Sequence, residues 1–287
     1  MQRISFYLAF AFLWTISLLP MPVLFFFSDL LYIFVYHIVG YRKKVVFKNL
    51  RNSFPEKSDE EIKSVAKKFY KHFCDMFFET FKCLNISKKE IRKRITIKNP
   101  KFLDELYHKE KSIIAVFTHY ANWEITLGIP MQIKHRNISI YKPQSNKYFN
   151  KLSLDIRKKF GMEMVAMKNT LRCIMEYQQK NVRTLVVFLS DQSPVRTEIH
   201  YRMNFLNQDT PVFLGVEKIS RKLNQPVVFM DLKKVKRGYY SLEYVMLFEN
   251  PAHTADYEIT NRHMKYLEEK IKAEPAYWLW THRRWKY

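Results

Sequence analysis

Two side chains in residues 112–124 have the types and the spacing to carry acid–base chemistry. The short apolar run at residues 113–117 is typical of a buried strand, and His119 and then Glu124 follow it. Five residues turn about 140° on a regular helix, so the two side chains meet only if His119 lies in the turn after the strand and Glu124 in a following helix. Turns of this kind are where α/β folds place their chemistry.

This pair has a clear chemical use as a general base and its carboxylate partner. An imidazole can take a proton from a hydroxyl group, and a carboxylate can orient the ring and stabilise the imidazolium that forms. Because the chain has no Gly-x-Ser-x-Gly turn, we expect the nucleophile to be a hydroxyl of the substrate. A histidine bonded locally at a strand end, with a solvated glutamate nearby, is the structural alternative that the spacing alone leaves open.

Composition narrows the classes of partner. The 287 residues are 47% hydrophobic, enough for a sizeable core, and carry a net charge of +22. Such a charge attracts nucleic acid, anionic lipid or an acidic protein. Because the basic residues are scattered, without an arginine-rich arm or zinc-finger spacing, an anionic surface or substrate is favoured and no nucleic-acid partner is expected. The three cysteines lack ligand spacing, so we expect reduced thiols, no metal and no cofactor.

The N-terminal 40 residues are expected to anchor the chain to a membrane. Residues 4–28 carry no charge, and as a helix they would extend roughly 37 Å, enough to span a bilayer. Pro20 and Pro22 should kink or break this helix, so a bent span and a broken helix lying partly in the interface both stay open. Arg3 precedes the run and five basic residues at 42–51 follow it, which places residues 41–287 on the cytoplasmic side.

The remaining residues read as a single α/β domain with a largely parallel or mixed sheet. Ser58 and Glu61 form a capping-box pattern before an amphipathic helix that extends towards residue 84. From residue 112 strands alternate with helices, the pattern of an αβ sandwich. The expected strands are residues 112–117, 138–141, 184–189, 227–232 and 239–247; the expected helices are residues 123–134, 147–160, 171–179, 216–223 and 257–273.

Several further residues suit a site at the strand ends. His119, Lys142 and Asp191 each follow a strand, so the same edge of the sheet should carry all three. Asp191 can bind a cation, orient an arginine or simply cap a turn. Arg157, on an expected helix, can contact phosphate or lie on a solvated face. The C-terminal alternation of aromatic and basic residues suits a membrane interface, and we expect these residues there: Trp278, Trp280, Arg283, Arg284 and Trp285.

Taken together, these motifs resemble the bacterial lipid A biosynthesis acyltransferases, within the wider lysophospholipid acyltransferase group. The resemblance covers nearly the whole chain, and its most specific motif is the C-terminal one. Glu124 stands where many relatives in the wider group have aspartate, and Lys142 replaces a common arginine. The matching segments are His119-Tyr-Ala-Asn-Trp-Glu124, Tyr141-Lys-Pro143, the helix around Arg157, Asp191-Gln192, Asn204-Phe-Leu, Thr210-Pro-Val-Phe-Leu-Gly215 and Trp280-Thr-His-Arg-Arg-Trp285.

The resemblance implies a glycerol-3-phosphate acyltransferase-like fold and transfer of a fatty acyl group from acyl carrier protein to a hydroxyl of a lipid A precursor at the bacterial inner membrane. His119 would be the general base and Glu124 its partner. The residues expected to contact substrate are Arg157, Asp191, Lys142, Gln192 and Asn122. Two alternatives stay open: an acyltransferase for a lysophospholipid, aminolipid or other glycolipid, and a basic membrane-tethered module that binds lipid or nucleic acid without catalysis.

Overall fold

A mixed seven-stranded sheet forms the centre of the computed structural model, which describes residues 2–144 and 146–287. The strand order is β1-β9-β8-β2-β5-β3-β4, and all neighbouring pairs are parallel except β8 with β9. The strands are β1 (Ile95–Ile97), β2 (Ile113–Phe117), β3 (Arg136–Tyr141), β4 (Glu163–Ala166), β5 (Thr184–Leu189), β8 (Val227–Lys236) and β9 (Tyr239–Phe248). All five expected strands are present, and the predicted α/β class with a mixed sheet is confirmed.

Two pairs of short strands were not expected from the sequence. β1 and β4 complete the edges of the sheet, where brief pairing suffices, and β6 (Arg202–Phe205) with β7 (Gln208–Pro211) forms a separate antiparallel hairpin. Strands of three or four residues give too little alternation to be recognised in a sequence.

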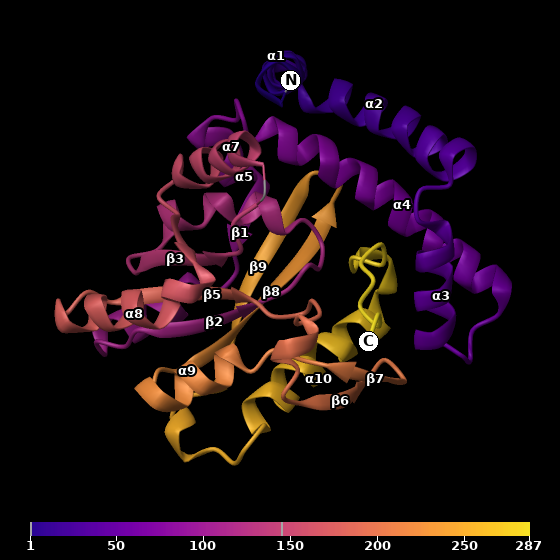
Figure 1. The fold of residues 1–287 in the computed structure, drawn as a ribbon. Coiled ribbons are helices and arrows are strands. Elements are labelled where there is room, and N and C mark those ends of the chain that lie inside the picture. Colours follow the sequence, from indigo (N-terminus) through magenta and orange to yellow (C-terminus); the bar gives the residue numbers. More distant parts are fainter. Residues whose placement is uncertain (1, 145) are drawn as a thin grey trace.

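Helices pack around this sheet or, like the first of those given next, on a neighbouring helix (Figure 1). They are α3 (Lys43–Ser53), α4 (Asp59–Lys82), α5 (Lys88–Arg94), α6 (Pro100–His108), α7 (Lys147–Lys158), α8 (Thr170–Gln179), α9 (Gly215–Leu223) and α10 (Glu258–Ala273). The capping box predicted for α4 is confirmed: the amide of Glu61 donates to the Ser58 hydroxyl at 3.2 Å, and the amide of Ser58 donates to the Glu61 carboxylate at 2.8 Å. This cap fixes the start of the longest helix, whose buried face then enters the core.

The predicted helix at residues 123–134 is wrong in type. Two short 3-10 helices, η2 (Trp123–Gly128) and η3 (Pro130–Gln132), occupy this stretch. Pro130 lacks an amide hydrogen and cannot donate the next helical hydrogen bond, which accounts for the interruption between η2 and η3, although Ile129 itself keeps α-helical dihedrals (φ −70°, ψ −43°). The tighter geometry changes the direction in which Glu124 points, with consequences for the site described below.

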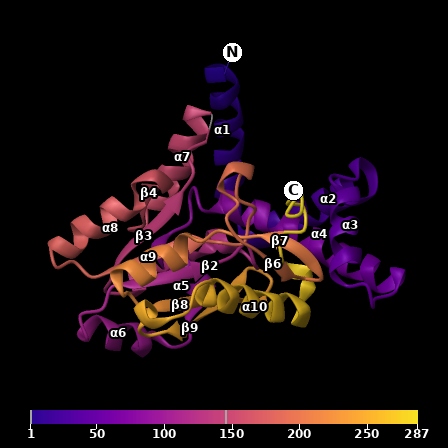
Figure 2. The same ribbon diagram turned by 60° about the horizontal axis from the view of Figure 1, so that its bottom comes forward.

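The N-terminal segment is a broken helix, as the two prolines predicted. α1 (Gln2–Leu18) ends before Pro20, and α2 (Met21–Tyr32) continues without interruption into the π-helical turn η1 (Ile33–Val39). Figure 2 shows α1 projecting from the body beside α7, while α2 runs along α4. Among the described residues, the one helical segment that is long and apolar enough to span a membrane, by length and composition, is Met21–Val39, which overlaps only the end of the uncharged run at residues 4–28. The side chains of residues 2–5 and 8, Arg3 among them, lie outside the described structure.

Candidate active site

Strand register brings His119 and Asp191 together. β2 and β5 are parallel neighbours, and Phe117 pairs with Leu189 at their carboxyl ends. His119 follows Phe117 by two residues, and Asp191 follows Leu189 by two, so both leave the sheet at the same level and the same edge. Residues distant in sequence therefore meet as a direct result of one strand pairing.

Asp191 holds His119 by both its backbone and its ring. The Asp191 Oδ1 lies 2.7 Å from His119 Nδ1, and Oδ2 accepts the His119 backbone amide at 3.0 Å and the indole N–H of Trp278 at 2.9 Å. Only 2% of Asp191 is exposed. Burial alone would raise its pKa, but the charge and hydrogen bonds of His119 and the Trp278 bond outweigh burial and lower it. Asp191 is therefore a carboxylate held ionised against the imidazole.

This contact fixes the tautomer of His119. Because a carboxylate accepts, Nδ1 must carry the proton, which leaves a lone pair on Nε2. Nε2 lies 3.1 Å from the side-chain nitrogen of Gln192, and the imidazole packs edge-to-face on Trp123 with a centroid separation of 4.8 Å. With 15% of the His119 side chain exposed, Nε2 is the ring nitrogen placed to accept a proton from outside.

Glu124 is not the carboxylate that binds His119, contrary to the sequence prediction. Its Oε1 accepts the guanidinium of Arg157 at 2.8 Å and the indole N–H of Trp123 at 3.2 Å. Both partners are largely shielded, with 20% of the Glu124 side chain and 26% of the Arg157 side chain exposed. The 3-10 turn directs Glu124 towards α7, while the β2–β5 register places Asp191 beside His119. Arg157 therefore lies at the site, although its partner is Glu124.

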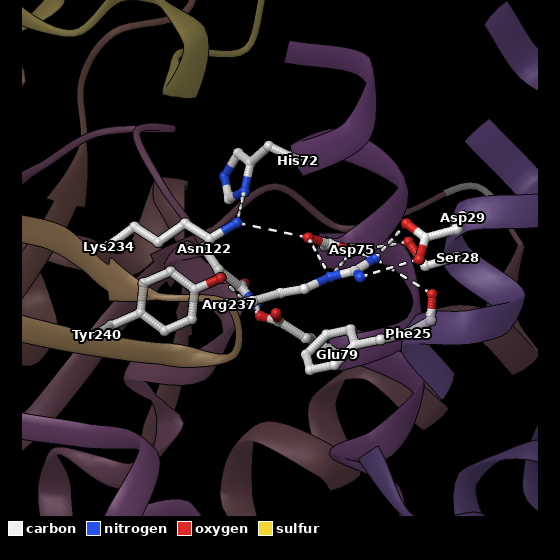
Figure 3. A network of polar contacts seen from close by, with 10 residues as sticks. All are labelled: Phe25, Ser28, Asp29, His72, Asp75, Glu79, Asn122, Lys234, Arg237 and Tyr240. Carbon is white, nitrogen blue, oxygen red and sulfur yellow. Dashed lines mark hydrogen bonds and ion pairs between the residues drawn. The ribbon is translucent and has the colours of Figure 1, made fainter. Parts of the chain in front are cut away.

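Asn122 is buried and holds this turn in place by hydrogen bonds. Its side-chain oxygen accepts the backbone amide of Glu124 at 3.0 Å, and its nitrogen donates to Glu79 on α4 (Figure 3). Only 1% of Asn122 is exposed, so it lies beneath the surface of the site, and its predicted contact with substrate stays a prediction. Glu79 also accepts the Tyr240 hydroxyl at 2.8 Å, and burial raises the pKa of Glu79 to about 7.

Sequence reasoning missed Glu79 and Tyr240, and it assigned Trp278 to a membrane interface rather than to Asp191. A sequence signal existed for Glu79 alone: it lies on the buried face of α4, three residues after Met76 and one after Phe78, where a carboxylate is unusual. Tyr240 and Trp278 reach the site from β9 and from the C-terminal segment, and no local pattern reports such contacts.

A narrow, mostly apolar cavity of about 40 Å³ begins beside Glu124 and Arg157. Flexible Met162 and Met230 are among its walls, so the cavity can widen by side-chain rotation. On β3 it reaches from Ser139 to the buried Asn137, whose two side-chain polar atoms have no hydrogen-bond partner among the described residues. Asn137 pairs with Leu185, four residues before Leu189. It therefore lies about 13 Å along the strands from the carboxyl end of β5, which Asp191 follows.

Lys142 and Gln192 lie at the predicted edge of the sheet. Lys142 is exposed one residue beyond the end of β3, and Gln192 contacts His119 directly. Among the described residues, no group of three or more His, Cys, Asp and Glu side chains is arranged to hold a metal ion.

The C-terminal aromatic and basic residues mostly form core, so their predicted membrane contact is wrong for Trp278, Trp280 and Arg284. Trp278 is 2% exposed, and Trp280 and Arg284 are fully buried. The Trp280 indole donates to the Pro275 carbonyl at 2.6 Å, and the Arg284 guanidinium donates to the Ser193 hydroxyl at 3.2 Å. The segment fills the space between the site and α3, where Asn49 donates to the carbonyl of Trp280 at 2.9 Å. Trp285 is half-buried, and Arg283 is exposed.

Comparison with known proteins identifies the family of the chain. A family model described as bacterial lipid A biosynthesis acyltransferase matches residues 1–287. The chain is similar to the lipid A biosynthesis palmitoleoyltransferase of Escherichia coli (strain K12), with 22% identity over 275 residues that cover 96% of this chain and 88% of that protein. It is similar to the same extent to the lipid A biosynthesis acyltransferase of Shigella flexneri, with 22% identity and the same coverage. The chain therefore belongs to the bacterial lipid A biosynthesis acyltransferase family and is an acyltransferase.

Proposed function

We propose that this protein moves a fatty acyl group from acyl carrier protein to a hydroxyl of a lipid A precursor, with His119 as general base. The observation that carries the proposal is the buried Asp191 carboxylate on His119 Nδ1, which leaves Nε2 as the ring nitrogen that can act as base once the acceptor hydroxyl replaces the Gln192 amide at 3.1 Å. Family membership supports the acyl transfer and the type of acceptor.

In this mechanism, His119 Nε2 removes the proton from the acceptor hydroxyl as its oxygen attacks the thioester carbonyl carbon. The ionised Asp191 carboxylate stabilises the positive charge of the imidazolium that forms. The tetrahedral intermediate then collapses, the carbon–sulfur bond breaks, and the imidazolium returns its proton to the departing thiolate of the carrier. The products are the O-acylated lipid and the free carrier thiol, and His119 is regenerated.

The Glu124–Arg157 ion pair is proposed to mark the entrance for the acyl chain. This pair lines the apolar cavity, whose volume of about 40 Å³ holds only a few water molecules, so the acyl chain could enter with its thioester carbonyl near His119 only after Met162 and Met230 move aside. Arg157 and the exposed Lys142 are proposed to meet anionic groups of the acceptor. The net charge of +22 would attract acyl carrier protein, which is acidic, and increase the association rate.

We further propose that the protein acts at the bacterial inner membrane, with residues 1–40 as the anchor and residues 41–287 facing the cytoplasm. The apolar segment Met21–Val39 and the lipid nature of the acceptor support this location. The basic residues after the segment support the cytoplasmic orientation.

An in vitro transfer assay on the detergent-solubilised full chain tests the proposed reaction. It offers a set of acyl carrier protein thioesters with a tetra-acylated lipid A precursor, with and without Kdo, and mass spectrometry reads the products. We expect one added acyl mass that disappears with His119→Ala. The exposed His200→Ala variant is the matched control, because His200 lies outside the site, and it should retain activity. Retained transfer by a folded His119→Ala variant would refute His119 as the base.

The alternative acceptors are a lysophospholipid, an aminolipid or another glycolipid. If the lipid A precursor gains no acyl mass, the same donors offered with these lipids identify the acceptor. Lipid profiling of a deletion strain separates the cases independently: unchanged lipid A with an altered phospholipid or aminolipid would contradict the lipid A proposal.

A further inference from the structure

The segment Met21–Val39 carries two opposite stripes along its length. One stripe is buried against the domain: Met21, Leu24, Ser28, Tyr32 and Tyr36. The other consists of large apolar side chains left exposed: Val23, Phe26, Phe27, Leu30, Ile33, Phe34, Ile38 and Val39. Phe26 is 60% exposed and Ile38 is 71% exposed. Spacings of three and four residues in both stripes show that one face packs on protein and the other lacks a cover.

Polar contacts fasten the middle of this segment to the domain (Figure 3). Arg237, at the turn between β8 and β9, donates to the two carboxylate oxygens of Asp29 at 3.0 and 2.7 Å and to the Phe25 carbonyl at 3.2 Å. The same guanidinium donates to the buried Asp75 of α4 at 2.6 Å, and the Ser28 hydroxyl donates to Asp75 at 2.8 Å. The turn between β8 and β9, the helix α4 and the helix α2 are thus joined by one polar network.

This network is incompatible with a helix that crosses a bilayer. α2 packs along α4, so a crossing α2 would either take α4 into the hydrocarbon or separate from it. α4 carries many charged residues, including Lys67, Lys71 and Asp75, and each is strongly unfavourable in hydrocarbon. Separation would break the already exposed Arg237–Asp29 pair, uncover the buried Asp75 and place Asp29 in the bilayer interior.

Cations follow the segment directly in the chain, beside Tyr36 near its end. α3 follows directly and presents Lys44, Lys48 and Arg51 to solvent, and Lys43 lies 4.0 Å from the ring centroid of Tyr36. They line a groove of about 720 Å³ beside the end of η1. An exposed apolar segment followed at once by exposed basic residues complements an anionic bilayer surface, whose headgroups lie just outside its hydrocarbon.

We propose that Met21–Val39 lies in the plane of the membrane on one leaflet, with its exposed stripe in the hydrocarbon boundary and the α3 cations at anionic headgroups. The domain then remains on the same side of the bilayer as both ends of the segment. This inference rests on the proposed membrane location and is independent of the reaction catalysed.

Spin labels on the exposed stripe test the orientation. Cysteines replace Val23, Leu30 and Ile38, one at a time, in the full chain carrying Cys173→Ala; Cys74 and Cys83 are buried. In vesicles of phosphatidylethanolamine and phosphatidylglycerol, the depth of each label is measured from its relative exposure to oxygen and to a water-soluble nickel chelate. We expect all three labels at one shallow depth. A label at Met175, exposed on α8, is the aqueous control.

Each other result overturns a defined part of the proposal. A crossing helix places the label at residue 30 deepest and those at residues 23 and 38 near opposite surfaces, which would refute the in-plane orientation alone. Labels without lipid contact would refute the membrane location as well. Strong coupling between labels of two molecules would assign the stripe to a second copy of the chain.

Vesicle binding gives a second measurement that needs no label. Phe26→Gln with Ile38→Gln removes apolar contact without touching the polar network, so the partition coefficient should fall by about tenfold or more. Met175→Gln, at a similarly exposed apolar side chain on α8, should leave binding unchanged. Equal binding by the wild type, the double variant and Met175→Gln would contradict the proposed contact of the exposed stripe with the bilayer.

Discussion

Glu79 links the catalytic turn to α4. The variant Glu79→Gln tests whether the fold raises the pKa of this carboxyl group above its ordinary value. Oε2 of Glu79 accepts hydrogen bonds from the Asn122 amide and the Tyr240 hydroxyl, and Oε1 has no hydrogen-bond partner among the described residues. Burial raises its pKa from 4.5 to about 7, although both hydrogen bonds oppose the rise. The folded state therefore binds a proton that the unfolded chain has released between these two values.

The magnitude follows from the linkage between proton binding and folding. Because the folded pKa is the higher one, Glu79 has no effect on stability below pH 4.5, and its ionisation reduces the free energy of unfolding as pH rises through 7. At about 1.36 kcal/mol for each pH unit between the two pKa values, the full effect is about 3 kcal/mol. Glutamine lacks this dependence but places an N–H where Glu79 has an unpaired oxygen, a pH-independent cost of about 1–3 kcal/mol.

Chemical denaturation in detergent at several pH values measures this difference. Relative to wild type, the free energy of unfolding of Glu79→Gln should rise by about 3 kcal/mol between pH 4 and pH 8, with the rise centred between 4.5 and 7. Glu198→Gln is the matched control, because this exposed glutamate stays in water in both states. A difference between Glu79→Gln and wild type that does not change with pH would refute the reasoning.

Three further changes test the site itself. Asp191→Asn should lower kcat by about 10³–10⁴-fold with little change in KM, because the amide can donate to Nδ1 and move the proton to Nε2; a steady-state assay showing less than tenfold loss would contradict the assigned tautomer. Arg157→Met should raise KM for the acceptor more than it lowers kcat, since the partly exposed guanidinium is proposed to meet an anionic group of the acceptor; initial rates at varied acceptor concentration distinguish the two parameters, and an unchanged KM would exclude the proposed contact. Asn137→Ala should shift the preference towards longer acyl chains by removing the polar side chain at the far end of the cavity; product masses from mixed carrier thioesters report the shift, and an identical product distribution would show that the chain does not reach residue 137.

Local signals in the sequence determined the elements and several residues of the site. The alternation of apolar strands and amphipathic helices gave the α/β class, the pair Ser58 and Glu61 fixed the start of α4, and Pro20 fixed the break between α1 and α2. His119 and Asp191 were identified because each directly follows a buried strand. These features depend on a few neighbouring residues, so they can be recognised in the sequence before the fold is known.

Tertiary structure decided which of these residues act together. The spacing from His119 suggested Glu124 as its partner, but the parallel register of β2 with β5 supplies Asp191 at Nδ1, and α7 supplies Arg157 to Glu124. The C-terminal aromatic residues matched a membrane interface by composition, yet Trp278 and Trp280 are buried where they support Asp191 and contact α3. Exposure and hydrogen-bond partnership depend on neighbours that are distant in the chain, and strand pairing and helix packing alone set those neighbours.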